Sequence, residues 1–67
     1  MITLIVNGAT RQLPKSVSVS TLIDEMGLSG KRIALERNGD IVPHSTFASQ
    51  QLEDGDKLEI VVAVGGG

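Results

Sequence analysis

The chain begins with an alternation of apolar and polar positions. One face of this first segment carries Ile2, Leu4 and Val6. A period of two is typical of a β-strand with one buried face. Asn7-Gly8 follows, the dipeptide most typical of a type I′ hairpin turn. We expect the return strand over residues 10–13, because Pro14 has no amide hydrogen to donate to a sheet. The sequence thus predicts an N-terminal β-hairpin.

A helical period comes next. Four apolar side chains recur at intervals of three and four residues, at Val19, Leu22, Ile23 and Met26. This spacing places them on one stripe of an α-helix, which we expect to face a sheet. Ser18 is a residue type that caps helix N-termini, and Gly27 stands where a left-handed residue ends many helices. We expect about two and a half turns, too short to persist without packing.

Strand patterns return in the second half of the chain. Ile33 and Leu35 alternate with polar or small residues, and Asn38-Gly39 gives a second hairpin signal before the short strand Ile41-Val42. Pro43 ends that strand. A last strand is predicted over residues 57–63, with three apolar residues on one face: Leu58, Ile60 and Val62.

The connection between these strands, residues 44–51, is polar and is expected to contain one helical turn. We interpret Phe47 within it as a core residue and His44 as an ordinary loop histidine, because there is no cysteine for a metal site. Leu52 is expected to return to the core. In the turn that follows, Glu53, Asp54 and Asp56 are interpreted as solvated turn residues, with recognition of a basic partner as the alternative.

The predicted order is strand, strand, helix, strand, short strand and final strand. It indicates an α+β fold of the ubiquitin-like β-grasp type, with four or five strands in a mixed sheet and one main helix across one face. We expect residues 1–64 to form this single domain and residues 65–67 to form a flexible glycine tail. A chain of 67 residues supports only one compact core.

Composition excludes several classes of function. There is no cysteine, which excludes disulfides, thiolate metal sites and thiol catalysis. A net charge of −2 and a single aromatic residue argue against nucleic acid as a partner. The N-terminus lacks the features of a signal peptide, and no apolar run approaches the roughly 18 residues that span a bilayer, so we expect a cytoplasmic protein without membrane contact.

The sequence ends with Gly65, Gly66 and Gly67 directly after the last predicted strand. Glycine has no Cβ, so such a tail can be threaded through a slot that excludes side chains. At about 3.3 to 3.6 Å per residue, residues 64–67 extend roughly 13 Å. The terminal carboxylate is ionised at neutral pH and can attack the α-phosphate of ATP. The chain has no phosphate-binding Gly-rich motif of its own. The alternative interpretation is a frayed terminus.

Three segments, the last of which contains this tail, resemble the ThiS family, the sulfur-carrier proteins of thiamine biosynthesis, over essentially the whole chain. They are residues 34–43 (ALERNGDIVP), residues 52–61 (LEDGDKLEIV) and residues 63–67 (AVGGG). The glycine ending alone also fits molybdopterin-type sulfur carriers and other ubiquitin-like proteins. The middle segments favour the thiamine branch.

The resemblance implies that this chain is a carrier and not an enzyme, with no bound cofactor or metal. It implies that an E1-like adenylyltransferase uses ATP to activate Gly67. A sulfur donor, such as a relay from a cysteine desulfurase, then converts Gly67 into a thiocarboxylate. Thiazole synthase finally takes the sulfur. Because the chain has no cysteine, the sulfur must come from a partner.

A docking surface is predicted on the outer face of the sheet. Ile5 on the first strand and Val61 and Ala63 on the last strand point away from the core. If the two strands are neighbours, these side chains form an uncovered apolar patch beside the tail. The alternative is that they are isolated exposed residues without a role.

Two other functions stay open from the residues alone. One is a ubiquitin-like modifier, in which Gly67 is joined to lysines of other proteins. The other is a β-grasp module that binds RNA or a ligand, with a tail that plays no part.

Overall fold

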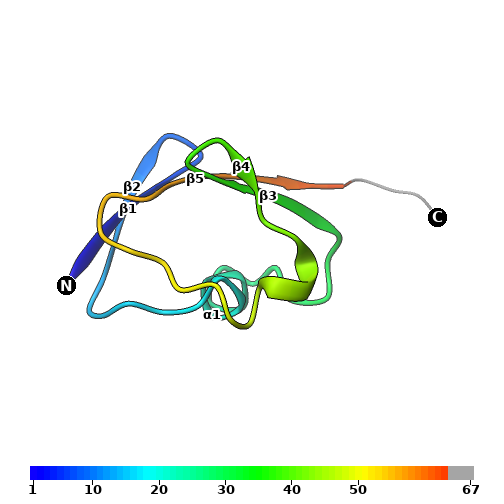
Figure 1. The fold of residues 1–67 in the computed structure, drawn as a ribbon, viewed down its shortest axis with the longest axis horizontal. Helices are drawn as coiled ribbons and strands as arrows, with labels where there is room; N and C mark the ends of the chain where they lie inside the picture. Colours follow the sequence, from blue (N-terminus) through cyan, green and yellow to red (C-terminus); the bar gives the residue numbers. More distant parts are fainter. Residues whose placement is uncertain (64–67) are drawn as a thin grey trace.

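The computed structural model describes residues 1–63, so the predicted domain boundary at residue 64 and the glycine tail lie outside the described residues. Five strands form one sheet in the order β2-β1-β5-β3-β4, and helix α1 lies beneath one face (Figure 1). β1 and β5 pair in parallel, and the other neighbours are antiparallel. This mixed sheet with one helix confirms the predicted β-grasp fold.

The elements follow the predicted order. Their bounds are β1 Ile2–Val6, β2 Ala9–Leu13, α1 Val19–Glu25, β3 Ile33–Arg37, β4 Asp40–Ile41 and β5 Lys57–Val62, with a 3-10 turn at His44–Thr46. No helix of residues 1–63 is long and apolar enough to cross a membrane.

Both hairpins turn where their Asn-Gly dipeptides stand. Asn7 and Gly8 have φ angles of 50° and 82°, and Asn38 and Gly39 have 52° and 90°. Positive φ at both central positions defines the type I′ turn, whose twist matches that of the flanking strands. Both predicted turns are therefore confirmed.

Helix α1 is held against the sheet by its predicted stripe. Val19 and Leu22 are fully buried and Ile23 nearly so, whereas Met26 is only partly buried. The hydroxyl of Ser18 accepts a hydrogen bond from the Thr21 amide at 3.2 Å, as expected of an N-cap. The helix has seven residues, so it is shorter than expected; it ends before Met26 and Gly27.

The core lies between α1 and the inner face of the sheet. Phe47 and Leu52 are buried, as predicted from their positions in the connection to β5. On the inner face of β5, Leu58 and Ile60 are buried, but Val62 is 39% exposed. Val62 pairs with Ile33 at the first residue of β3, at the end of the sheet from which the tail departs. Burial on the inner face of β5 therefore decreases toward the end of the strand.

Candidate functional site

The candidate site is the end of β5, where the chain enters the glycine tail. We call residues 61–63 the tail root. β3 holds the tail root on one side, with Val61 opposite Ala34 and Val62 opposite Ile33. The Ala63 amide continues this ladder by donating to the Arg32 carbonyl at 2.9 Å. β5 lies at the centre of the sheet, and the glycine tail follows it in the sequence.

On the other side of β5, the side chain of Asn7 makes the hydrogen bonds that a neighbouring strand would otherwise make. The Asn7 side chain donates from Nδ2 to the Ile60 carbonyl at 3.0 Å, and its Oδ1 accepts from the Ile60 amide at 2.7 Å. This pair of bonds imitates a neighbouring strand at the point where β1 has already ended. Among the described residues, none is paired with the tail root on this side. β5 is therefore held on both sides up to Ile60, and only by β3 beyond it.

The predicted docking residues are exposed, but the register does not bring them together. Val61 is 63% exposed, Ile5 is 38% exposed, and Ala63 is also exposed. β1 and β5 are neighbours as predicted, yet Ile5 lies opposite Lys57. Four residues of strand, about 13 Å, separate Lys57 from Val61.

The apolar neighbour of Val61 is instead Ala34 on β3. Arg32 lies opposite Ala63 through the hydrogen bond above. The outer face of the tail root therefore presents three small or branched apolar residues beside one cation. Sequence reasoning missed Ala34 and Arg32, because only the β3–β5 register identifies them as neighbours of the tail root.

The turn before β5 contains a buried charge, and its interpretation as solvated was wrong for one residue. Asp56 is only 5% exposed. Its carboxylate accepts hydrogen bonds from Arg37 Nε at 2.7 Å, Asn38 Nδ2 at 3.0 Å and the Glu53 amide at 2.8 Å. Glu53 and Asp54 are exposed, as predicted.

The protonation of Asp56 follows from these contacts. Burial alone raises the pKa of a carboxyl group, but the hydrogen bonds from Arg37, the Glu53 amide and Asn38 outweigh it and hold the pKa of Asp56 below its usual value. Asp56 is thus an anion at neutral pH. It ties the β3–β4 hairpin to the start of β5, so its role is to place the strand that carries the tail root.

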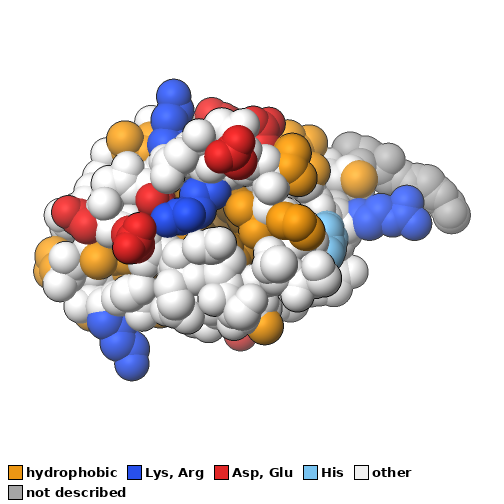
Figure 2. All heavy atoms as spheres, in the orientation of Figure 1, with side chains coloured by type: hydrophobic (Ala, Val, Ile, Leu, Met, Phe, Trp, Pro, Cys, Tyr) orange, Lys and Arg blue, Asp and Glu red, His pale blue; other side chains and the backbone are white. Residues whose placement is uncertain are grey.

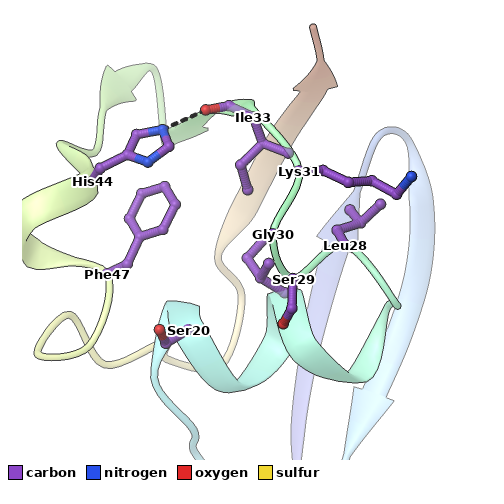
Figure 3. A pocket seen from close by; sticks show the side chains of 9 residues that line it. Ser20, Leu28, Ser29, Gly30, Lys31, Ile33, His44 and Phe47 are labelled. Carbon is purple, nitrogen blue, oxygen red and sulfur yellow. Dashed lines mark hydrogen bonds between the residues drawn. The ribbon is translucent and has the colours of Figure 1, made fainter. Parts of the chain in front are cut away.

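A cavity of about 360 Å³ opens beside the tail root, on the helix side of the sheet (Figure 3). Its lining includes Ile23 and Ser20 of α1, Leu28 and Lys31 of the following loop, and the pair His44 and Phe47. The rings of this pair stack with centroids 4.6 Å apart. His44 Nε2 lies 2.6 Å from the Ile33 carbonyl oxygen, so this histidine is more than a loop residue; it ties the 3-10 turn to β3.

In the view of Figure 2, several acidic side chains lie close together, whereas basic side chains are spread across the face. Within residues 1–63, no three metal-ligating side chains of the His, Cys, Asp or Glu type come together. The described residues thus offer two features for a partner: the exposed apolar side chains at the tail root, and the cavity on the helix side of the sheet. Gly65, Gly66 and Gly67 lie outside them, so their predicted roles stay predictions.

Comparison with known proteins gives a consistent set of relatives. The model of the ThiS family matches residues 4–67. A protein named thiazole synthase from Paramagnetospirillum magneticum is 45% identical over 64 residues, which are 96% of this chain but only 20% of that protein. The chain therefore spans about a fifth of the length of this relative. An uncharacterized protein, ycf40, from Pyropia yezoensis is 35% identical over 98% of this chain and 93% of its own length.

A solved structure has the same fold. The crystal structure of the thiamine biosynthesis protein (ThiS) from Geobacter metallireducens superposes with a TM-score of 0.83 and 26% identity. The match covers 98% of this chain and 100% of that one. The similarity thus includes the complete β-grasp domain.

Proposed function

The chain belongs to the ThiS family, and from this we propose that it is a sulfur carrier for thiazole formation in thiamine biosynthesis. Its working group is the carboxylate of Gly67. The observation that carries the proposal is that the family match extends to Gly67. The segment that ends with Gly67 follows β5, the central strand of the sheet. One relative is named thiazole synthase and one solved structure is named a thiamine biosynthesis protein, and these names favour this branch over a molybdopterin-type carrier.

The first step is activation of the tail by an E1-like adenylyltransferase. A carboxylate oxygen of Gly67 attacks the α-phosphorus of ATP, and pyrophosphate leaves. The product is an acyl-adenylate, in which AMP is a good leaving group. Gly65 and Gly66 have no side chains and so allow the tail to pass through a narrow channel to the nucleotide.

The second step loads the sulfur. A donor such as a desulfurase relay carries the sulfur as a persulfide; a second thiol of the donor attacks the inner sulfur of this persulfide, so that a disulfide forms and the outer sulfur leaves as sulfide. The sulfide attacks the acyl carbon, and AMP leaves with its bonding electrons. One oxygen of Gly67 has then been replaced by sulfur, giving a thiocarboxylate. Thiazole synthase consumes this group and returns a carboxylate, so the chain acts as a cosubstrate. The relative named thiazole synthase supports this choice of partner, because it contains a segment similar to nearly the whole chain.

The contribution of the fold is to present the tail and the residues next to it to a partner enzyme. The chain has no Gly-rich nucleotide motif with lysine, so the partner must supply ATP binding and catalysis. Exposed apolar side chains at Val61, Ala63 and Ala34 give that partner a surface at the tail root. Ile5 contributes a separate contact further along the sheet.

Adenylation is tested by ATP–pyrophosphate exchange. An E1-like adenylyltransferase from the same organism is incubated with ATP and labelled pyrophosphate, with the full chain or with a variant that lacks Gly66 and Gly67. We expect label to enter ATP only with the full chain. Equal exchange with the truncated variant would refute a role for the Gly67 carboxylate.

A further inference from the structure

The cavity beside the tail root has features of an anchor site for a partner side chain. Its deepest lining residues belong to the core: Ile23, Ile33 and Phe47 are 6%, 5% and 9% exposed. Leu28 adds a partly buried wall. An apolar side chain that enters such a cavity gains burial without disturbing the core, and interface energy concentrates in pockets of this kind.

The polar residues of the cavity lie around this apolar floor. Ser20 stands at one side and Ser29 at another, and the Ser29 hydroxyl is already engaged with Asp24 Oδ1 at 2.8 Å. In Figure 3, His44 and Phe47 face the cavity from one side, and Lys31 extends outward on the opposite side. Lys31 makes no ion pair with the residues that the structure describes. The rim therefore carries one carboxylate that already accepts a hydrogen bond from Ser29, and one cation that is available to an acidic group of a partner.

The cavity is linked to the tail root through Ile33. Ile33 lines the cavity and pairs with Val62, whose side chain is 39% exposed on the same face of the sheet. Arg32, between Lys31 and Ile33, bonds through its carbonyl to Ala63. Arg32 thus puts one positive charge at the tail root, and Lys31 puts another at the neighbouring cavity, in a protein of net charge −2. An enzyme that acts on Gly67 must surround this end of the molecule.

From this geometry we propose that the cavity is a second docking site, which receives an apolar side chain from an acidic loop of the adenylyltransferase. The apolar side chain rests on Ile33 and Phe47, and a neighbouring carboxylate of the loop pairs with Lys31. The site lies on the helix side of the sheet, so the partner holds the tail root from both faces. This inference rests on the proposed function and adds the chemistry of the partner surface.

The test measures the dissociation constant of the full chain and its variants for the E1-like adenylyltransferase. Ser20→Phe fills the cavity from α1, and Ser45→Phe makes the same change at an exposed position that does not line it. We expect Ser20→Phe to weaken binding about tenfold or more and Ser45→Phe to change it less than about twofold. Thermal unfolding of both variants checks that the fold is kept.

A charge reversal provides the second arm. Lys31→Glu is expected to weaken binding about fivefold to tenfold at low salt, with a smaller effect at high salt. Lys15→Glu, in the loop that follows β2, is the matched control and is expected to have less than about a twofold effect. The Lys31 site is exposed, so this variant tests the proposal even if Ser20→Phe fails to fold.

Each result decides between two claims. If the wild-type chain binds and supports ATP–pyrophosphate exchange, but Ser20→Phe and Lys31→Glu bind as well as their controls, the second docking site is refuted and the sulfur-carrier proposal stands. If Ser20→Phe and Lys31→Glu lose binding to thiazole synthase but keep binding to the adenylyltransferase, the assignment of the cavity to the adenylyltransferase is overturned. Sedimentation showing that Ser20→Phe breaks a dimer of this chain would also overturn it. A wild-type chain that neither binds nor supports exchange would refute both proposals.

Discussion

Replacing the buried carboxylate before β5 tests how the strand that carries the tail is held. In Asp56→Asn the side chain keeps its shape but loses its charge and one acceptor oxygen. The amide can still accept from Arg37 and the Glu53 amide at one oxygen. Its NH₂ group then faces Asn38 Nδ2, a donor that sits 3.0 Å from the present carboxylate. One hydrogen bond is lost outright, and that with Arg37 is weakened.

The expected loss of stability follows from these contacts. A hydrogen bond to a charged group contributes about 1.5 to 3 kcal/mol. The Arg37 side chain is 23% exposed and can regain some water, which lowers the cost. We expect a decrease of about 2 to 4 kcal/mol in the free energy of unfolding at pH 7. A domain of this size has a total of only about 3 to 10 kcal/mol, so the change is large.

The pH dependence separates the charge effect from a packing defect. The pKa of Asp56 is depressed in the folded state below its ordinary value of 3.8. Its contribution is therefore fully present above that value and is lost as the pH falls through the lower folded pKa. The difference between wild type and Asp56→Asn should be constant from pH 7 to about 5 and shrink from about pH 4 downward.

The assay is urea unfolding followed by circular dichroism at a series of pH values. Asp54→Asn is the matched control. Its Oδ1 accepts from the Thr3 amide at 2.7 Å in an exposed position, and an Asn side chain can keep that bond. We expect a change below about 0.5 kcal/mol. A loss in Asp56→Asn no larger than in this control, or a gap that is the same at pH 7 and pH 2, would refute the reasoning.

Two further substitutions test the tail root. Asn7→Ala removes both hydrogen bonds to Ile60 and puts alanine at a φ of 50°. We therefore expect the free energy of unfolding to fall by about 2 kcal/mol and the Ile60 amide to exchange its hydrogen faster. An unchanged exchange rate would contradict the role of Asn7. Val61→Asp alters a 63% exposed side chain, so stability should change by less than about 0.5 kcal/mol while affinity for the adenylyltransferase falls; unchanged affinity would rule out docking at this residue.

Local patterns in the sequence were enough to predict the elements. Each depends on residues close in the chain: the two Asn-Gly turns, the stripe of α1 and the alternation in β1 and β5. The order of these elements then indicated the β-grasp fold. The helix was predicted too long because Met26, though on the stripe, lies past the end of α1 and is only partly buried.

The candidate site depends on contacts between distant residues, and these were not predicted. Asp56 and Arg37 are 19 residues apart, and the Asp-Gly-Asp sequence fits a solvated turn equally well until β3 brings the arginine beside it. Asn7 and Ile60 are 53 residues apart, and a turn asparagine gives no local sign of a second role. The sequence predicts that β1 and β5 are neighbours, but it does not predict their register. For this reason Ile5 is expected beside Val61, whereas it lies opposite Lys57. The proposed chemistry of the tail, by contrast, rests on residue identity alone, and it stays a prediction because Gly65, Gly66 and Gly67 lie outside the described residues.

The most direct test of the central claim is the intact mass of the chain after incubation with ATP, the E1-like adenylyltransferase and sulfide. The account predicts a gain equal to the exchange of one oxygen atom for one sulfur atom, located by fragmentation at Gly67 and absent from the variant without Gly66 and Gly67. An unchanged mass, with an enzyme shown to be active by pyrophosphate exchange, would contradict the sulfur-carrier function.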